Sequence, residues 1–146
     1  MSDLTPKVTG VGGVFFKCKD PDAVKEWYGK NLGFDIDAYG SSFRFKKMKD
    51  PTKNGYLQWS PFKEDTDYFA PSEKEFMLNY RVQNLDKLLR NLKEAGVTIL
   101  DEVQTIDYGR FVHILDLEGN KIELWEPVDE VFDAFYKVQN KEGKEA

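Results

Sequence analysis

The feature of this sequence that most constrains its fold is an internal repeat. Val14–Lys17 (Val-Phe-Phe-Lys) matches Leu78–Arg81 (Leu-Asn-Tyr-Arg), 64 residues further along the chain. Near the other end of each copy, Trp59–Pro61 (Trp-Ser-Pro) matches Trp125–Pro127 (Trp-Glu-Pro) with a shift of 66 residues. Because chance rarely produces two matches in the same order, the chain is predicted to contain two copies of one supersecondary unit.

The first copy, residues 8–63, is predicted to form a strand, a helix and three further strands. Val8–Cys18 is the opening strand. Asp20 and Pro21 are typical of a helix N-cap and first helical position, and Gly33 is typical of a helix end. Apolar spacing predicts that the helix buries one face, made of Val24, Trp27, Tyr28 and Asn31 or Leu32. The strands that follow are predicted at Phe34–Ala38, Ser42–Lys47 and Tyr56–Ser60.

The second copy, residues 76–127, repeats this order. Met77–Val82 is a strand, a helix opens near Asn84, and Gly96 closes it. The apolar stripe of this helix is Leu85, Leu88, Leu89 and Leu92. The last three strands are predicted at Thr98–Val103, Arg110–Leu115 and Lys121–Trp125. The two copies together form a single α+β domain over residues 8–127.

Outside the two copies lie a linker, a helix and a tail. The linker Phe62–Lys74 is rich in Pro, Asp and Ser, and contains Tyr68 and Phe69, which could form a loop over a cavity mouth or pack on its rim. Residues 128–140 are predicted to form an amphipathic helix, and residues 141–146 a solvated tail. The apolar stripe of this helix is Val128, Val131, Phe132 and Phe135.

Charge and composition exclude several classes of partner. The net charge of −5 makes nucleic acid and anionic membrane surfaces unsuitable partners, and it is compatible with a neutral or cationic small molecule. No apolar run approaches the roughly 20 residues that a membrane span needs. Cys18 is the only cysteine, which excludes an intrachain disulfide and a thiolate-rich zinc site. Without a visible secretory signal, we expect a cytoplasmic protein.

A β-hairpin near the end of the second copy carries the strongest candidate site. A three-residue loop, Leu117–Gly119, with Gly119 in the left-handed conformation, would pair Asp116 with Asn120. Continuing that register sets His113 opposite Glu123, and sets Leu115 opposite Lys121 and Phe111 opposite Trp125. Opposed residues share a face, with Cβ atoms about 4.5–5.5 Å apart. The single histidine is therefore predicted to lie beside a carboxylate.

With these motifs the chain resembles the vicinal oxygen chelate superfamily, which includes glyoxalase I, bleomycin-resistance proteins, fosfomycin-resistance enzymes and extradiol dioxygenases. The residues that carry the resemblance are Lys19-Asp20, Trp27-Tyr28 and Leu32–Phe34 in the first copy, and Tyr108–Arg110 and Asp116–Leu124 in the second. The resemblance implies two βαβββ units that curl into an open, barrel-like cavity with flanking helices, where a small molecule binds. It also implies a homodimer.

The metal site of this superfamily is only partly present in the sequence. The resemblance places ligands early in the first strand and late in the last strand of each unit. Gly13 and Met77 occupy the two first-strand positions, and neither suits the hard divalent ions that these enzymes use. Glu123 matches one last-strand position; the other falls at Leu57 or Gln58, and the Trp-x-Pro alignment favours Leu57. A divalent metal held by Glu123 with His113 and Gln58 stays a possible cofactor.

The remaining site predictions concern catalysis and ligand binding. His113 is the candidate proton carrier because its ordinary pKa is about 6.5, and Glu123 is its candidate partner. A carboxylate that faces a barrel interior is costly unless it is paired. Strand alternation and aromatic character complete the predicted ligand-binding set, which is Phe15, Gln58, Trp59, Asn79, Phe111, His113 and Trp125.

Two functions remain open at this stage. One is a metal-free binding module of the bleomycin-resistance kind. The other is a lyase or isomerase of the lactoylglutathione lyase type that uses Glu123 with His113.

Overall fold

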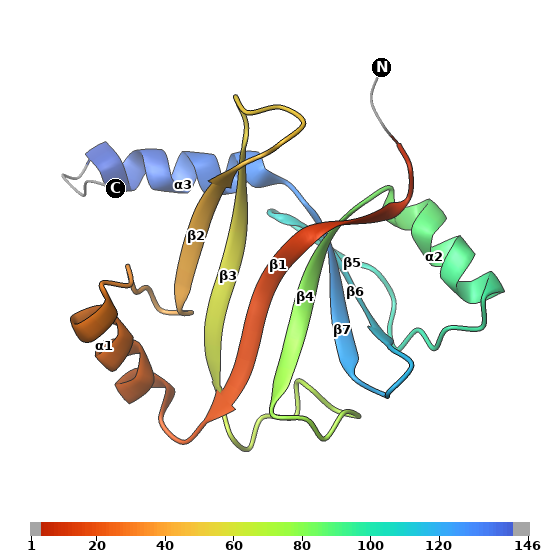
Figure 1. Ribbon diagram of the computed structural model, residues 1–146, viewed down its shortest axis with the longest axis horizontal. Coiled ribbons are helices and arrows are strands. Elements are labelled where there is room, and N and C mark those ends of the chain that lie inside the picture. Colours follow the sequence, from red (N-terminus) through yellow and green to blue (C-terminus); the bar gives the residue numbers. More distant parts are fainter. Residues whose placement is uncertain (1–3, 142–146) are drawn as a thin grey trace.

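The structure, a computed structural model, describes residues 4–141, with side chains up to residue 135 (Figure 1). The strands of this part of the chain are β1 (Lys7–Cys18), β2 (Ser41–Lys46), β3 (Asn54–Lys63), β4 (Phe76–Gln83), β5 (Gln104–Ile106), β6 (Gly109–Leu115) and β7 (Lys121–Pro127). The helices are α1 (Pro21–Leu32), α2 (Leu85–Glu94) and α3 (Asp129–Lys141). Residues 142–146 of the predicted tail lie outside the described part.

The strands form one curved sheet in the order β2-β3-β1-β4-β7-β6-β5. The first strand of each half pairs in parallel with the last strand of the same half, β1 with β3 and β4 with β7. The two halves join where β1 pairs antiparallel with β4. α1 and α2 lie on the outside of the two halves, and α3 passes from β7 to the first half (Figure 1). The predicted α+β fold with an open, barrel-like sheet is confirmed.

Two of the predicted strands are wrong. Phe34–Ala38 and Thr98–Val103 each make only one isolated bridge, at Ile36 and at Ile99. In the first segment, the backbone turns back at Asp37, whose N–H donates to the carbonyl of Gly40 at 2.8 Å. In the second segment, the side chain of Asp101 accepts the backbone N–H of His113 at 2.8 Å, where a regular strand would use a carbonyl.

The helix ends follow the sequence signals in α1 and depart from them in α2. Asp20 Oδ1 accepts the N–H of Ala23 at 3.1 Å, and Gly33 ends α1 with φ of +75°. Asn84 makes no side-chain cap on α2, although it precedes the helix. Instead Glu126 of β7 accepts the N–H of Leu85 at 2.8 Å, so a tertiary contact replaces the local cap.

The outer face of the sheet is packed differently in the two halves. Behind the second half, Leu85 and the leucines of α2 pack against an aliphatic core that includes Val112 and Leu124. Behind the first half, Tyr28 of α1 packs on Trp59 with ring centroids 4.6 Å apart. The other large members of the predicted α1 face are more than half exposed, Trp27 at 54% and Leu32 at 57%, so that part of the prediction is wrong.

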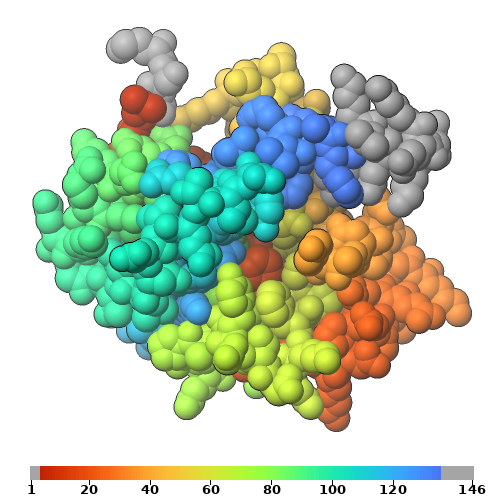
Figure 2. All heavy atoms as spheres, turned by 180° about the vertical axis from the view of Figure 1, so that it is seen from behind, coloured from red at the N-terminus to blue at the C-terminus, as the bar shows by residue number. Residues whose placement is uncertain are grey.

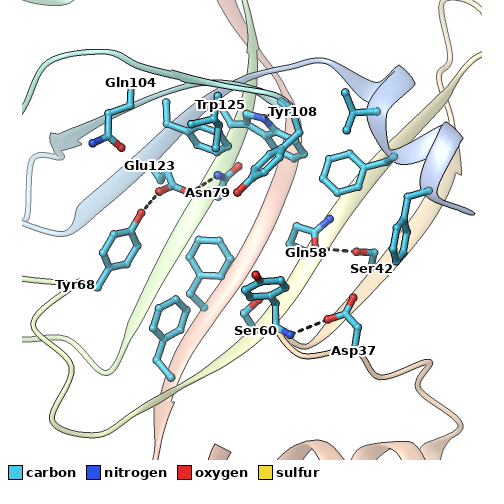
Figure 3. A pocket seen from close by; sticks show the side chains of 18 residues that line it. Asp37, Ser42, Gln58, Ser60, Tyr68, Asn79, Gln104, Tyr108, Glu123 and Trp125 are labelled. Atoms are coloured by element: carbon cyan, nitrogen blue, oxygen red, sulfur yellow. Dashed lines mark hydrogen bonds between the residues drawn. The ribbon is translucent and has the colours of Figure 1, made fainter.

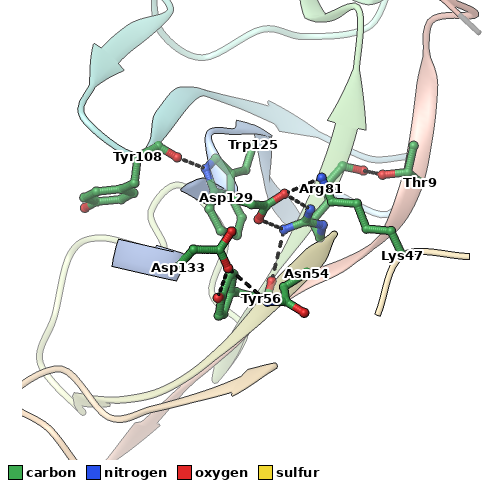
Figure 4. A network of polar contacts seen from close by, with 9 residues as sticks. All are labelled: Thr9, Lys47, Asn54, Tyr56, Arg81, Tyr108, Trp125, Asp129 and Asp133. Carbon is green, nitrogen blue, oxygen red and sulfur yellow. Dashed lines mark hydrogen bonds and ion pairs between the residues drawn. The ribbon is translucent and has the colours of Figure 1, made fainter. Parts of the chain in front are cut away.

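Ion pairs and hydrogen bonds connect α3 to both halves (Figure 4). Asp129 at its start receives two hydrogen bonds from Arg81 of β4, at 2.9 and 2.6 Å, and an ion pair from Lys47 at 2.8 Å. One turn later, Asp133 accepts hydrogen bonds from the Tyr56 hydroxyl and the Asn54 amide. These contacts hold α3 across the open side of the sheet. No helix in the described range 4–141 is long and apolar enough to span a membrane.

Candidate functional site

A cavity of about 590 Å³ lies on the inner face of the sheet, opposite α1 and α2. In Figure 2, which shows the molecule from behind, atoms of β1 (red) are visible at the bottom of a hollow. The rim of the hollow is formed by the linker (yellow-green), the β5 region (cyan) and α3 (blue). The volume falls in the range of small-molecule pockets, about 300–1,000 Å³.

The lining of the cavity is mainly aromatic, with a few polar side chains. The aromatic residues are Phe15, Tyr39, Phe62, Tyr68, Tyr108, Phe111, Trp125, Phe132 and Phe135. The polar residues are Asp37, Ser42, Gln58, Ser60, Asn79, Gln104 and Glu123. Figure 3 shows the polar groups in two sets, one around Glu123 and one around Gln58, with aromatic rings between them.

The predicted hairpin register is confirmed. Asp116 pairs with Asn120, Gly119 takes φ of +78°, and His113 lies opposite Glu123. Glu123 faces the cavity, whereas His113, beside it on the same face, is 5% exposed and does not line the cavity, so its contact with a ligand stays a prediction. The loop length fixed this register, and the register placed the two residues on one face.

His113 is held between two carboxylates. Its Nε2 lies 2.8 Å from Glu123 Oε2, and its Nδ1 lies 2.6 Å from Asp101 Oδ2. Because each ring nitrogen faces a carboxylate oxygen, both nitrogens act as donors, which is the imidazolium form. Burial alone would lower the pKa of His113, but the hydrogen bonds to Glu123 and Asp101 raise it above its ordinary value.

Glu123 accepts hydrogen bonds from three side chains of its own chain. Besides His113, the Tyr68 hydroxyl donates to Oε2 at 2.5 Å and the Asn79 amide donates to Oε1 at 2.7 Å (Figure 3). Burial alone would raise the pKa of Glu123, but these donors hold it below its ordinary value. Burial and the neighbouring charge of Glu123 raise the pKa of Tyr68, so its proton is retained. Glu123 is therefore a stabilised, buried carboxylate at the cavity wall.

The first half carries a neutral counterpart of this arrangement. Gln58 of β3 lies beside Gly13 of β1, as Glu123 of β7 lies beside Asn79 of β4. The Gln58 carboxamide oxygen accepts a hydrogen bond from the Ser42 hydroxyl at 2.7 Å. The structural equivalents are thus Gln58 with Glu123 and Gly13 with Asn79, each in a parallel pair of strands.

This register corrects three positions of the sequence analysis. The predicted site residue Trp59 lies on the outer face against Tyr28 and Phe34, because neighbouring residues of a strand point to opposite faces and Gln58 faces the cavity. The last-strand position of the first half is Gln58, so the alignment that favoured Leu57 is off by one residue. Met77, aligned with Gly13, is fully buried between Phe15 and Phe69, and the residue beside Glu123 is Asn79.

The other predicted ligand-binding residues face the cavity. Phe15, Gln58, Asn79, Phe111 and Trp125 all line it, and the rings of Phe111 and Trp125 stack with centroids 5.7 Å apart. That these residues contact a ligand stays a prediction. The five side chains lie around one cavity, as the alternation of inward and outward residues along the strands predicts.

The residues around Glu123 do not fit the divalent metal site that the superfamily resemblance implies. Of the four equivalent positions, only Glu123 is a carboxylate, and its oxygens already accept three hydrogen bonds. Gly13 has no donor atom, and hard cations prefer several oxygen ligands. Over the described residues, no group of three or more His, Cys, Asp or Glu is placed to hold a metal ion.

Among the polar site residues that the sequence did not predict, three come from segments without regular secondary structure. Asp101 lies in the irregular segment 98–103 and Asp37 in the turn after Ile36, and the apolar pattern predicts a strand in both places. Tyr68 stood out as an aromatic residue in a polar linker, yet nothing in the sequence related it to Glu123. A side chain reaches its partner from a loop by tertiary geometry, and no periodicity records that.

Comparison with known proteins identifies the family. Residues 10–124 match the sequence model of the Glyoxalase/Bleomycin resistance protein/Dioxygenase superfamily, which covers most of the chain. The chain belongs to this superfamily.

Solved structures show the same fold at low sequence identity. Methylmalonyl-CoA epimerase from Mycobacterium tuberculosis is 22% identical, with a TM-score of 0.58 over 88% of this chain and 95% of that chain. The Streptomyces coelicolor epimerase in complex with 2-nitronate-propionyl-CoA is 16% identical, with a TM-score of 0.62 over 84% and 99%. A superfamily member from Vibrio splendidus 12B01 is 12% identical, with a TM-score of 0.51 over 84% and 99%.

One curated protein also shares a segment with the chain. It is the transcription elongation factor GreA of Lachnoclostridium phytofermentans, 32% identical over 77 residues. The match covers 51% of this chain and 43% of that protein, so the chain spans less than half the length of this relative.

Proposed function

We propose that this chain is a small-molecule-binding protein of the superfamily that holds its ligand in the inner cavity without a divalent metal. The observation that supports this most is the hydrogen bonding of Glu123, whose carboxylate is stabilised by His113, Tyr68 and Asn79. Protein donors already use three of the roughly four acceptor directions of this carboxylate. The aromatic walls supply apolar surface for a ligand body, as small-molecule sites commonly do.

A lyase or isomerase of the lactoylglutathione lyase type, using Glu123 with His113, is the second candidate. It is supported by the hydroxyl of Tyr68 and the imidazolium of His113, which both lie within hydrogen-bond distance of Glu123. Such groups carry out general acid–base catalysis. Two pKa shifts argue against this candidate. The lowered pKa of Glu123 makes the carboxylate a weak base, and the raised pKa of Tyr68 makes the hydroxyl a weak acid. Ligand binding needs no change of either charge state.

The metal content of the purified protein separates the two candidates. We expect substoichiometric Mn, Fe, Ni and Zn by elemental analysis, both in the wild type and in Glu123→Gln. Glu118→Gln, on the exposed hairpin turn, is the matched control for loss of one carboxylate. Near-stoichiometric metal that is lost in Glu123→Gln and kept in Glu118→Gln would overturn the metal-free proposal.

Catalysis is tested directly with substrates that have an acidic C–H bond. Hemithioacetals test the lactoylglutathione lyase candidate. Acyl-CoA esters are added because the similar epimerases are named for methylmalonyl-CoA. Exchange of the substrate C–H for deuterium in D₂O is followed by NMR. Thermal stabilisation by a ligand without exchange supports the binding function, since a ligand that binds only the native state raises its apparent stability. Exchange that depends on Glu123 would instead support the enzyme.

We also propose that the protein forms a homodimer in the cytoplasm. Large apolar side chains of α1 that do not line the cavity are exposed, Trp27 at 54% and Leu32 at 57%. Light scattering coupled to gel filtration measures the mass, which is expected to be about twice the chain mass of 16.9 kDa. A monomeric mass at micromolar concentration contradicts this part of the proposal.

A further inference from the structure

The charges that face the cavity are all negative. Asp37 and Glu123 are the charged side chains among the described residues that line it, and no described lysine or arginine does so. They come from different halves of the molecule, and Figure 3 shows them in the two separate polar sets. A carboxylate at each end of an aromatic space favours a ligand of the opposite charge.

The cations near the cavity are already paired within the protein. Arg81 is bound by Asp129 through two hydrogen bonds. His113 lies between Glu123 and Asp101, so this group of three carries a net charge of −1 when the imidazolium is formed. Lys121 donates to the carbonyl of Tyr68 at 2.6 Å and does not line the cavity. Among the described residues none of these cations lines the cavity, although Lys121 keeps its charge and Arg81 shares the carboxylate of Asp129 with Lys47.

The polar groups at the wall offer acceptors at Asn79 and Asp37 and one donor at Gln58, whose Nε2 has no hydrogen-bond partner among the described residues. Asn79 is 2% exposed and uses its amide N–H for Glu123, and its Oδ1 has no hydrogen-bond partner in the described part of the chain. Asp37 uses one oxygen, Oδ1, to accept the N–H groups of Tyr39 and Gly40. A buried acceptor without a donor is costly. A ligand that brings an N–H group could donate it to the carboxylate of Asp37, which lines the cavity.

The walls between the two carboxylates suit a cationic group as well as an apolar body. The aromatic side chains Tyr68, Phe111 and Trp125 surround the Glu123 end. Aromatic faces attract ammonium and guanidinium groups, and recognition of organic cations by aromatic cages uses this attraction.

From these four features we propose that the natural ligand is a small organic cation, an amine or guanidine with an aromatic or apolar body. The proposal rests on the proposed binding function and deepens it by naming the ligand class. Carboxylates, phosphates and acyl-CoA esters are disfavoured, because they would bring negative charge against Asp37 and Glu123. Its observable consequence is a dependence of affinity on ligand charge.

Three indoles of similar size measure this dependence. Tryptamine is cationic, tryptophol is neutral and indole-3-propionate is anionic. By calorimetry at pH 7 we expect tryptamine to bind about tenfold more tightly than indole-3-propionate, with tryptophol between them, as charge-assisted hydrogen bonds imply. Equal affinities for all three overturn the cation inference and leave the binding function intact. If screening sets of aromatic amines, alcohols and acids all fail to bind, both the inference and the binding function are contradicted.

Variants that remove one negative charge show which carboxylate contributes to the affinity for the cationic ligand. Asp37→Asn keeps an oxygen for the turn and removes one charge, and it is expected to weaken tryptamine binding roughly fivefold. Asp35→Asn, on an exposed neighbour that does not line the cavity, is the matched control and is expected to leave affinity unchanged. Glu123→Gln tests the other end, and Asp37→Asn keeps the inference testable if that variant folds poorly. Unchanged tryptamine affinity in Asp37→Asn, or an equal loss in Asp35→Asn, contradicts the proposal.

Discussion

Each half of the molecule places a pair of parallel strands under the cavity, and the two pairs present different side chains to it. In the second half, Glu123 is a buried carboxylate with three side-chain donors. In the first half, Gln58 is a neutral amide that accepts one hydroxyl, from Ser42. One backbone arrangement therefore supports a charged and an uncharged end, and the difference lies in the neighbours that each side chain receives.

The neighbours differ because the adjacent strand differs at one position. Beside Glu123 stands Asn79, which donates to it. Beside Gln58 stands Gly13, and a Cβ there would meet the Phe15 ring at 2.8 Å, so an aromatic ring fills the space that a donor would need. A buried carboxylate requires donors, whereas an amide tolerates their absence better. The asymmetry of the cavity therefore follows from the side chains that each half can place around one point.

The largest effect is expected when the two equivalent side chains are removed in turn. Glu123→Ala leaves the imidazolium of His113 and the donors of Tyr68 and Asn79 without their acceptor, so we expect a loss of about 3–5 kcal/mol in the free energy of unfolding. Gln58→Ala should cost only about 1 kcal/mol, because it removes one neutral hydrogen bond. Urea unfolding followed by circular dichroism measures both. Similar losses at the two positions would show that the halves are energetically alike.

The pH dependence of stability is the next largest effect, and of the two equivalent side chains only Glu123, with its partner His113, contributes to it. The raised pKa of His113 stabilises the fold fully below its unfolded pKa of about 6.5, and this contribution is lost as pH rises through the folded pKa. The lowered pKa of Glu123 stabilises the fold above its unfolded pKa of about 4.3, and this contribution is lost as pH falls through the folded pKa. The combined contribution is therefore largest between about pH 4.3 and 6.5.

Thermal melts from pH 3 to 9 check this window. The wild type minus Glu123→Gln difference in melting temperature should be greatest inside the window and shrink on both sides. Gln58→Ala is the control, because it changes no titrating group and should shift the melting temperature equally at every pH. A difference that grows steadily toward pH 9 would contradict the charged state assigned to His113.

The sequence predicted the parts of the site that local geometry controls. A three-residue loop fixes the hairpin register, so the pairing of His113 with Glu123 followed from the turn residues. The repeat correctly indicated which strands correspond, but its shifts of 64 at the first strand and 66 at the last differ from the structural offsets, 66 between Gly13 and Asn79 and 65 between Gln58 and Glu123. An error of one residue reverses the face of a strand, which is why Trp59 was placed in the cavity.

Contacts from irregular segments were beyond sequence reasoning. Asp101 reaches His113 because the chain leaves the strand pattern after Ile99, and Tyr68 reaches Glu123 from the linker. Phe69 next to it is 1% exposed and anchors that linker against Phe15 and Met77. Such positions depend on how the two halves close on each other, which no local pattern encodes.

The third prediction concerns the close packing of the two halves at β1. A Cβ on Gly12 would overlap Asn79 Oδ1 and approach Arg81 Cγ at 2.9 Å and Trp125 Cε3 at 3.0 Å. Gly12→Ala should therefore destabilise the protein by about 1–3 kcal/mol and displace the amide that supports Glu123. Gly10→Ala, on the same strand with nothing within 4 Å of its Cβ, is the control and should be close to neutral. Equal stabilities of the two variants would show that β1 adapts without cost.

The smallest effect compares the single hydroxyl that donates to each of the two equivalent side chains, Glu123 and Gln58. Tyr68→Phe removes a hydrogen bond to the charged Glu123, and Ser42→Ala removes one to the neutral Gln58. Hydrogen bonds to charged groups contribute about 1.5–3 kcal/mol and neutral ones about 0.5–1.5 kcal/mol, so Tyr68→Phe should be the more destabilising by about 1 kcal/mol.

The same variants should differ in their pH profiles. Loss of the Tyr68 hydroxyl removes one of the donors that lower the pKa of Glu123, so acid unfolding of Tyr68→Phe should begin at a higher pH than that of the wild type. Ser42→Ala should unfold at the wild-type pH, because its partner does not titrate. Guanidinium unfolding at pH 7 and acid titration of both variants, followed by tryptophan fluorescence, measure these differences. If both variants shift the acid transition equally, the hydroxyl of Tyr68 does not stabilise the carboxylate, and the charged end of the cavity rests on His113 and Asn79 alone.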